Sequence, residues 1–428
     1  MTQAPSSETT SPPPARDSRG GWLAALQASL ARLLPAPEVP IPAPTGPFAI
    51  GTTQQTLAVS ETRILTLDIW YPASSTAGYP VAPYAEKRLN EALSRQFRMP
   101  RFMFSEKPSY SHREAPPAPG PHPVVLFNHG YASFSKQNVS TFQELASHGF
   151  VVISLAHPGE SLLAQDGLGN PVFFDPQSEV NREISRLQKD LRTYAQRLAE
   201  RLSYQRQAHT PEAYAIASAQ VAQDPQFVAL RPQIARWVED TRQVIVALQT
   251  GRGEGILREA DPQNLTVMGH SLGGLVAMRL ACEFVEGLRG IINLDGPWLH
   301  EDPEAHAVPR VPSLNLLSTH YRLGKHNLST RGTLDGLYRE TSAAAHLVTL
   351  QGTSHYNFTD LNFVPALKLS GMLGPIDTRL MGELQNQAIR EFLRRTARSE
   401  GEFEAPLLPE HAAVEQVVHA GRRVGARA

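Results

Sequence analysis

The sequence predicts an α/β fold, with a mostly parallel central sheet, helices on both faces of that sheet and a helical insertion. Short apolar runs recur along the 428 residues, and stretches with helical periodicity lie between most of them. Strands buried on both faces have such continuous apolar runs, so the alternation indicates a parallel sheet covered by helices. Hydrophobic residues make up 41% of the chain and charged residues 19%, which allows a large core.

Charge and cysteine content exclude several classes of function. The chain has 40 Lys and Arg residues against 41 Asp and Glu residues, whereas a nucleic-acid-binding protein needs a basic surface. Cys282 is the single cysteine, so neither a disulfide framework nor a cysteine-based zinc site can form. No metal-ligand spacing stands out, and we expect neither a metal nor a cofactor.

The N-terminal segment, residues 1–45, is expected to precede the folded domain. Residues 1–20 are rich in Pro, Ser and Thr, a composition typical of disorder. Apolar residues then recur at helical spacing over 22–34, which predicts a short amphipathic helix that either contacts a membrane surface or packs on the protein. The chain has no apolar run long enough to cross a bilayer and no clear signal peptide, so the expected location is the cytoplasm.

The folded domain is expected over residues 46–398, beginning with two strands at 56–59 and 64–71 that form an antiparallel edge of the sheet. Residues 74–123 are rich in Pro near their end and are interpreted as irregular. A helix is predicted at 139–147. The predicted buried strands lie at 124–127, 150–155, 265–268, 291–294, 314–317 and 347–350.

Two narrow apolar stripes between residues 161 and 262 predict two long helices that pack on each other or on the sheet. The first belongs to a helical insertion at about 178–225. An insertion close to a site can be a lid or a structural cap, and both interpretations stay open. Residues 399–428 are expected to form a weakly ordered C-terminal tail.

The strongest chemical signal is Gly-His-Ser-Leu-Gly-Gly at residues 269–274, which matches G-x-S-x-G between a predicted strand and a predicted helix. This context is typical of the nucleophile turn of α/β-hydrolases. Ser271 is therefore the candidate nucleophile, on a strained turn where Cβ atoms at Gly269 and Gly273 would clash. The alternative is an ordinary glycine-rich turn.

A serine nucleophile needs a base, and the base needs an acid that orients it. His355 follows the last predicted parallel strand and is the candidate base, in preference to His129 and His157, which end earlier strands. Asp295 ends the strand that follows the nucleophile and is the candidate acid. In many hydrolases of this fold the acid lies one strand later, but residues 318–334 contain no acid here. Asp360 is the second candidate.

The oxyanion of the tetrahedral intermediate should bind two backbone N–H groups. One belongs to Leu272, the residue after the nucleophile. The other is assigned by position to Tyr131, in the turn after the strand at 124–127.

Several segments, taken together and in order, resemble the platelet-activating-factor acetylhydrolases and the bacterial dienelactone-hydrolase-like proteins grouped with them. The resemblance covers roughly residues 45–395. Its segments are Thr-Gly-Pro-Phe-Ala-Ile-Gly at 45–51, Asp-Ile-Trp-Tyr-Pro-Ala at 68–73, Phe-Asn-His-Gly at 127–130, Leu-Ala-Ser-His-Gly-Phe at 145–150, His-Pro-Gly at 157–159, the turn at 269–274, Leu-Asp-Gly-Pro-Trp at 294–298 and the G-x-x-H-x-x-F-x-D segment at 352–360.

The resemblance implies a calcium-independent esterase for short or truncated acyl chains, with a small-molecule ester or a phospholipid as substrate. It supports Asp295 as the acid and Tyr131 with Leu272 as oxyanion donors, and it places Trp298 beside the acyl group. True dienelactone hydrolases use a cysteine nucleophile, whereas this turn holds Ser271. The alternatives are a generic esterase, lipase or polyester hydrolase with a helical lid, and a non-catalytic ligand-binding protein on the same scaffold. The oligomeric state is left open.

Overall fold

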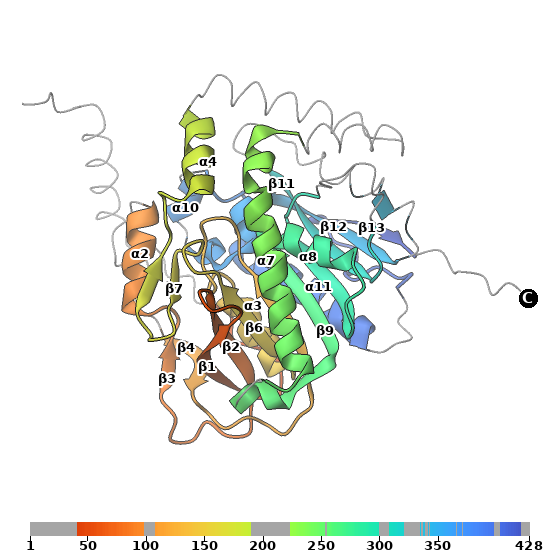
Figure 1. Cartoon of the computed structure of the whole chain (residues 1–428). Coiled ribbons are helices and arrows are strands. Elements are labelled where there is room, and N and C mark those ends of the chain that lie inside the picture. The colour runs from red at the N-terminus through yellow and green to blue at the C-terminus, as the bar shows by residue number, and fades with distance from the viewer. Residues whose placement is uncertain are drawn as a thin grey trace, which may run out of the picture.

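The computed structural model describes the chain from residue 41 to residue 420, with gaps (Figure 1). The helix predicted at 22–34 and most of the predicted insertion lie outside the described residues. The described residues are 41–97, 108–189, 223–252, 255–298, 308–320, 334, 337–338, 341, 343–364, 366–369, 371–397 and 403–420.

The described strands form one eleven-stranded sheet and a small separate hairpin. The hairpin consists of β7 (Leu163–Gln165) and β8 (Pro171–Phe173). In spatial order the strands of the large sheet are β3 (Val81–Pro83), β4 (Pro108–Arg113), β1 (Ala49–Ala58), β2 (Ile64–Ala73), β6 (Val151–Ala156), β5 (His122–Asn128), β9 (Ala260–His270), β10 (Leu288–Leu294), β11 (Ser313–His320), β12 (Ala345–Ser354) and β13 (Val414–His419).

The centre of the sheet is parallel, as the sequence predicts. β5 pairs in parallel with β6 and with β9, and β9, β10, β11 and β12 continue the parallel pairing. The carboxyl ends of these strands therefore lie along one edge, where the connecting loops can bring side chains together.

Helices cover both faces of the sheet, which confirms the predicted fold class (Figure 1). Val124 of β5 belongs to the core cluster that contains α7 and α8, whereas its neighbour Val125 belongs to the cluster that contains α3 and α11. The helices are α2 (Lys87–Phe97), α3 (Val139–Ser147), α4 (Glu179–Lys189), α7 (Pro225–Gln249), α8 (Leu272–Ala281), α10 (Ala366–Leu369) and α11 (Thr378–Ala397).

The long helix α7 runs across the front of the sheet in Figure 1 and packs on α8 and β9. Its first turn is set by sequence, because Pro225 occupies the start and the Asp224 side chain accepts a hydrogen bond from the Gln226 N–H (2.8 Å). Trp237, midway along α7, is fully buried. The described helix of the insertion, α4, packs against α7.

Three expectations about the edges of the domain are wrong. The leading pair β1–β2 is antiparallel but not at the edge, because β4 and β3 continue the sheet beyond β1. The stretch at 74–123, expected to be irregular, contains β3, α2 and β4. In the expected C-terminal tail, β13 pairs antiparallel with β12, because the outer edge of β12 offers unpaired backbone groups.

Candidate active site

Ser271 lies at the junction of β9 and α8, in a backbone conformation that residues other than glycine rarely adopt. Its φ is 55° and its ψ −115°, and its N–H donates to the Leu294 carbonyl (3.0 Å). A Cβ on Gly269 would lie 2.1 Å from the backbone of Gly273, and a Cβ on Gly273 would lie 2.0 Å from the Asn128 carbonyl oxygen. Only glycine fits at these two positions, as the turn motif predicts.

His355 and Asp295 come together at the carboxyl edge of the sheet. Asp295 directly follows β10 and His355 directly follows β12, and His355 Nδ1 lies 2.8 Å from Asp295 Oδ2. The Asp295 side chain is fully buried, whereas the His355 side chain is 22% exposed. The histidine can therefore meet a substrate while its partner stays inside the protein. Ser271, His355 and Asp295 follow the carboxyl ends of three strands of one parallel series.

Ser318 of β11 binds the carboxylate of Asp295 with two groups. Its N–H donates to Asp295 Oδ1 (2.8 Å) and its hydroxyl donates to Oδ2 (2.9 Å). Both carboxylate oxygens thus have donors, which fixes the orientation of the side chain. The sequence did not indicate Ser318, because residues 318–334 were considered only as a place for an acid, and they contain no Asp or Glu.

His270, inside the turn of Ser271, contacts the backbone of His355, the candidate base. Its Nε2 lies 3.0 Å from the His355 carbonyl oxygen, and the two ring centroids are 4.5 Å apart. A carbonyl only accepts, so Nε2 donates. Burial lowers the pKa of His270 well below its usual value, and the ring stays neutral at physiological pH. The sequence indicated only that His270 adjoins Ser271.

The turn after β5 passes close to Ser271, the candidate nucleophile. A Cβ on Gly130 would lie 3.3 Å from Ser271 Cβ, so this glycine lets the turn approach. Leu272 is the first residue of α8, where N–H groups have no acceptor within the helix and the helix dipole attracts negative charge. The hydrogen bonds of the described residues include none donated by the N–H of Tyr131. Both proposed oxyanion donors thus lie beside the nucleophile.

The side chain of Tyr131 connects this turn to the insertion, a link that the sequence did not indicate. Its hydroxyl donates to Asn181 Oδ1 of α4 (2.6 Å), and its ring meets Phe174 edge-on at 6.0 Å between centroids. Burial raises the pKa of Tyr131 to about 12, so the phenol remains a donor at neutral pH. The first helix of the insertion is thereby attached to the loop that carries a proposed oxyanion donor.

Asp360, the second candidate for the acid, has another set of partners. Its carboxylate accepts the N–H of Ser140 at the start of α3 (2.9 Å) and the hydroxyls of Ser140 and Tyr84. The carboxylate thus caps α3 and attaches it to the loop that carries His355. Burial raises the pKa of Asp360 to about 6.

Asp360→Asn is expected to reduce stability without removing activity. The oxygen of an asparagine can still accept from the Ser140 N–H and the Tyr84 hydroxyl, but its amide nitrogen replaces the oxygen that accepts from the Ser140 hydroxyl, and the loss of that bond lowers the free energy of unfolding by about 1 kcal/mol at pH 7. The pKa of Asp360 is higher in the folded than in the unfolded chain, where it is about 3.9. Its contribution to stability is therefore fully present below pH 4 and declines as the pH rises through 6.

Urea unfolding at pH 4.5 and pH 7 checks this expectation. The stability advantage of the natural chain over Asp360→Asn should be larger at pH 4.5 than at pH 7. A variant of unchanged stability that has lost ester hydrolysis would instead return Asp360 to the position of the acid.

The remaining sequence features lie as follows in the structure. Trp298 is 2% exposed and lies two residues after Gly296, where a Cβ would be 2.4 Å from the Ser271 carbonyl oxygen. Within the described ranges, no group of three His, Cys, Asp or Glu side chains could hold a metal ion. Burial raises the pKa of Cys282 to about 12, so this thiol is not a nucleophile at neutral pH. No helix in the described part of the chain combines the length and apolar character needed to cross a bilayer.

Comparison with known proteins places the chain in a family. Residues 35–405, most of the chain, match the profile of the family described as platelet-activating factor acetylhydrolase, isoform II. The chain belongs to this family. The match confirms the resemblance of the sequence motifs and covers every candidate site residue of the acetylhydrolase-like chain.

Two relatives show how far the similarity extends. The platelet-activating factor acetylhydrolase of Cavia porcellus is 22% identical over 288 residues, which cover 64% of this chain and 57% of that protein. The aligned region thus spans little more than half of the relative. A solved structure, the ferulic acid esterase from Streptomyces cinnamoneus, matches with a TM-score of 0.63 and 19% identity over 88% of this chain and 98% of that one. This likeness confirms the α/β-hydrolase fold.

Proposed function

We propose that this acetylhydrolase-family protein is a serine carboxylester hydrolase that uses Ser271, His355 and Asp295 and forms an acyl-enzyme. One observation carries the proposal: a strained serine turn and a hydrogen-bonded histidine–aspartate pair meet at the carboxyl edge of one sheet. A serine hydroxyl reacts at neutral pH only with such a base beside it. Membership of the acetylhydrolase family supports ester hydrolysis as the chemistry.

The first step is proton transfer from Ser271 to His355. Because a carboxylate accepts at Nδ1, the neutral ring carries its proton there and presents a lone pair at Nε2. Nε2 takes the hydroxyl proton as Ser271 Oγ attacks the ester carbonyl carbon. Asp295 stabilises the imidazolium that forms, and it can do so without moving because Ser318 already holds both of its oxygens.

The carbonyl oxygen becomes negative in this step and is bound by the N–H groups of Leu272 and Tyr131. The tetrahedral intermediate then collapses. His355 gives its proton to the leaving alcohol, and the acyl group stays on Ser271. A water molecule that is deprotonated by His355 attacks the acyl-enzyme and releases the carboxylic acid.

For the substrate we propose esters with short or truncated acyl groups, including phospholipids with a 2-acetyl group. The family and the name of the Cavia porcellus relative support this class. Trp298 is proposed to lie beside the acyl group, since the segment that it ends packs at Gly296 against the backbone of Ser271. The Tyr131–Asn181 link suggests a second possibility, in which the insertion influences which esters reach Ser271.

A series of p-nitrophenyl esters from acetyl to palmitoyl tests the substrate class. Phosphatidylcholines with 2-acetyl and with long 2-acyl chains, and methyl ferulate, complete the series. We expect kcat/KM to be highest for acetyl and butyryl esters and to fall at least tenfold by the decanoyl ester, because one pocket that closes around a short chain rejects a longer one.

Cleavage of the 2-acetyl phospholipid with little cleavage of the long-chain form would agree with the proposal. Equal or faster hydrolysis of palmitoyl esters would contradict it and favour a lipase-like or polyester-cleaving enzyme whose insertion opens the site. Preference for methyl ferulate would assign a third ester class.

A further inference from the structure

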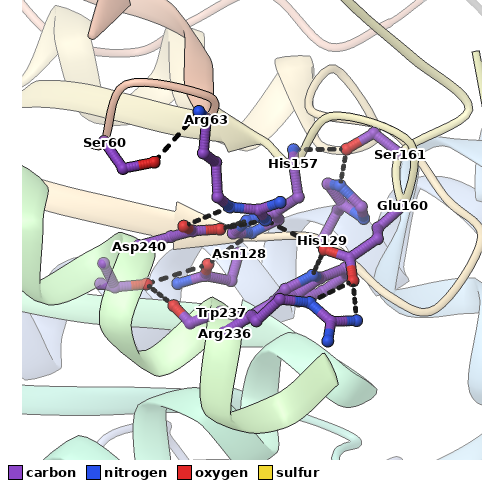
Figure 2. Close-up of polar contacts among 11 residues, drawn as sticks. Ser60, Arg63, Asn128, His129, His157, Glu160, Ser161, Arg236, Trp237 and Asp240 are labelled. Carbon is purple, nitrogen blue, oxygen red and sulfur yellow. Dashed lines mark hydrogen bonds and ion pairs between the residues drawn. The ribbon is translucent and has the colours of Figure 1, made fainter. Parts of the chain in front are cut away.

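His129, the residue before the oxyanion turn, has no assigned role in the proposed mechanism, on which this inference rests. Its side chain is fully buried and belongs to a polar network beneath α7, which Figure 2 shows. The ring lies between the turn that carries Tyr131 and the loop that follows β6. Both ring nitrogens have a hydrogen-bond partner.

The direction of each hydrogen bond of His129 follows from its partners. Nδ1 lies 2.7 Å from the Gly130 carbonyl oxygen, which only accepts, so Nδ1 carries the proton. Burial lowers the pKa of His129 to about 3, and the ring is neutral. Nε2 therefore accepts from the hydroxyl of Ser161 (2.6 Å). The Ser161 oxygen in turn accepts from the backbone N–H of His157 (2.6 Å). One tautomer satisfies the whole chain of bonds.

The Gly130 carbonyl belongs to the same peptide group as the N–H of Tyr131. In a trans peptide these two bonds point in opposite directions. The carbonyl oxygen is bound by His129 Nδ1–H and by the Ser133 N–H (3.1 Å), so the Tyr131 N–H points away from both. Rotation of this peptide would turn the N–H away from its present direction and break both bonds.

We propose that His129 is a positioning residue that sets the Gly130–Tyr131 peptide and thereby aims the Tyr131 N–H at the oxyanion. The Nδ1–H bond holds the carbonyl back, and by polarising the amide it makes the Tyr131 N–H a stronger donor. His129 itself does not contact the substrate. The donor is in place before substrate binds, so no reorganisation is needed as charge develops.

The ring of His129 is fixed by packing as well as by hydrogen bonds. Trp237 of α7 meets it edge-on, with centroids 4.8 Å apart, and stacks flat on His157 at 4.1 Å. His157 in turn binds Asp240 through Nδ1 (2.7 Å), and Arg63 binds the same carboxylate (2.6 Å). Helix α7 thus also holds the imidazole of His129, through a contact outside the turn.

His129→Asn and His129→Gln form a matched pair for testing the proposal. The amide of Asn reaches the position of Nδ1 and can still donate to the Gly130 carbonyl, whereas the amide of Gln reaches the position of Nε2 and can bind only Ser161. Both variants are neutral and remove the same ring. A purely structural role would therefore affect both alike.

We expect His129→Asn to keep kcat for p-nitrophenyl acetate within about fivefold of the natural chain. His129→Gln should lose about 100-fold in kcat with KM nearly unchanged, since donor misplacement affects mainly the transition state. The inhibition constant of an alkyl trifluoromethyl ketone, which adds to the serine as a tetrahedral oxyanion, should rise by a similar factor only in His129→Gln. The melting temperatures of the two variants should agree.

Equal loss of kcat in both variants, or loss that follows melting temperature, would overturn the positioning role. The proposed function is not affected by such an equal loss, provided that the natural chain cleaves the ester. A folded natural chain that neither cleaves esters nor binds the ketone would refute the proposed function, and the positioning role with it.

Discussion

Ser271→Ala is expected to lower kcat for p-nitrophenyl acetate by about 10⁵- to 10⁶-fold, close to the limit of detection. The Ser271 hydroxyl is the group proposed to form the acyl-enzyme, and no other residue of the turn at 269–274 carries a hydroxyl or a thiol. Residual hydrolysis should remain above the rate in buffer, because the oxyanion donors and substrate binding are retained.

The loss should be free of structural effects. Alanine keeps the Cβ of serine, so the backbone strain at φ 55° is the same in the variant and the stability of the turn is unchanged. The melting temperature should stay within a few degrees of that of the natural chain. Ser75→Ala, at an exposed serine outside the site, is the matched control and should hydrolyse at the natural rate. Activity above about 1% in Ser271→Ala would contradict the assignment.

Asp295→Asn is expected to lower kcat by about 10⁴-fold through the tautomer of His355. The N–H of Ser318 faces Asp295 Oδ1 and can only donate, so the oxygen of an asparagine must occupy that position. The amide nitrogen then faces His355 Nδ1 and donates to it. This moves the ring proton to Nε2, where the lone pair that should accept the serine proton is lost.

Ser318→Ala separates this effect from a loss of anchoring. It removes the hydroxyl bond to Asp295 Oδ2 but keeps the backbone N–H, the carboxylate and the correct tautomer. We expect a decrease in kcat of tenfold or less. A decrease in Ser318→Ala as large as that in Asp295→Asn would mean that orientation, and not the tautomer, explains the effect, and retained activity in Asp295→Asn would exclude Asp295 as the acid.

The core of the fold and of the candidate site was predictable because its signals are local. The glycine–serine–glycine spacing between a strand and a helix indicates the tight turn between β9 and α8, because only glycine lets the two chain segments approach so closely. Asp295 and His355 could be found by counting apolar strands, because parallel strands end at one edge. Their pairing at 2.8 Å agrees with that reasoning.

The supporting residues were not predictable, because they act across the sequence. Ser318 is 23 residues from Asp295, and Ser161 is 32 residues from His129. A serine in a strand and a histidine at a strand end have no pattern that distinguishes them from many others. Their partners are defined only when neighbouring strands set the register.

Several elements were missed for the same physical reason. β4 reads Pro-Ser-Tyr-Ser-His-Arg and has no apolar run, and β13 is polar at half of its positions. Both are ordered by pairing with a neighbouring strand and not by intrinsic propensity. β2 was predicted as a strand, but not its burial: β1 and β6 place it inside the sheet, and Lys136 lies 3.5 Å from its Asp68 and balances that charge.

Covalent labelling with a fluorophosphonate tests the central claim most directly. The purified full-length chain would be treated with the reagent, digested and mapped by mass spectrometry. The account predicts one adduct per chain, on Ser271, with loss of ester hydrolysis in proportion to labelling and no adduct in Ser271→Ala. A folded chain that stays unlabelled, as a non-catalytic ligand-binding protein would, or an adduct on another residue would contradict the account.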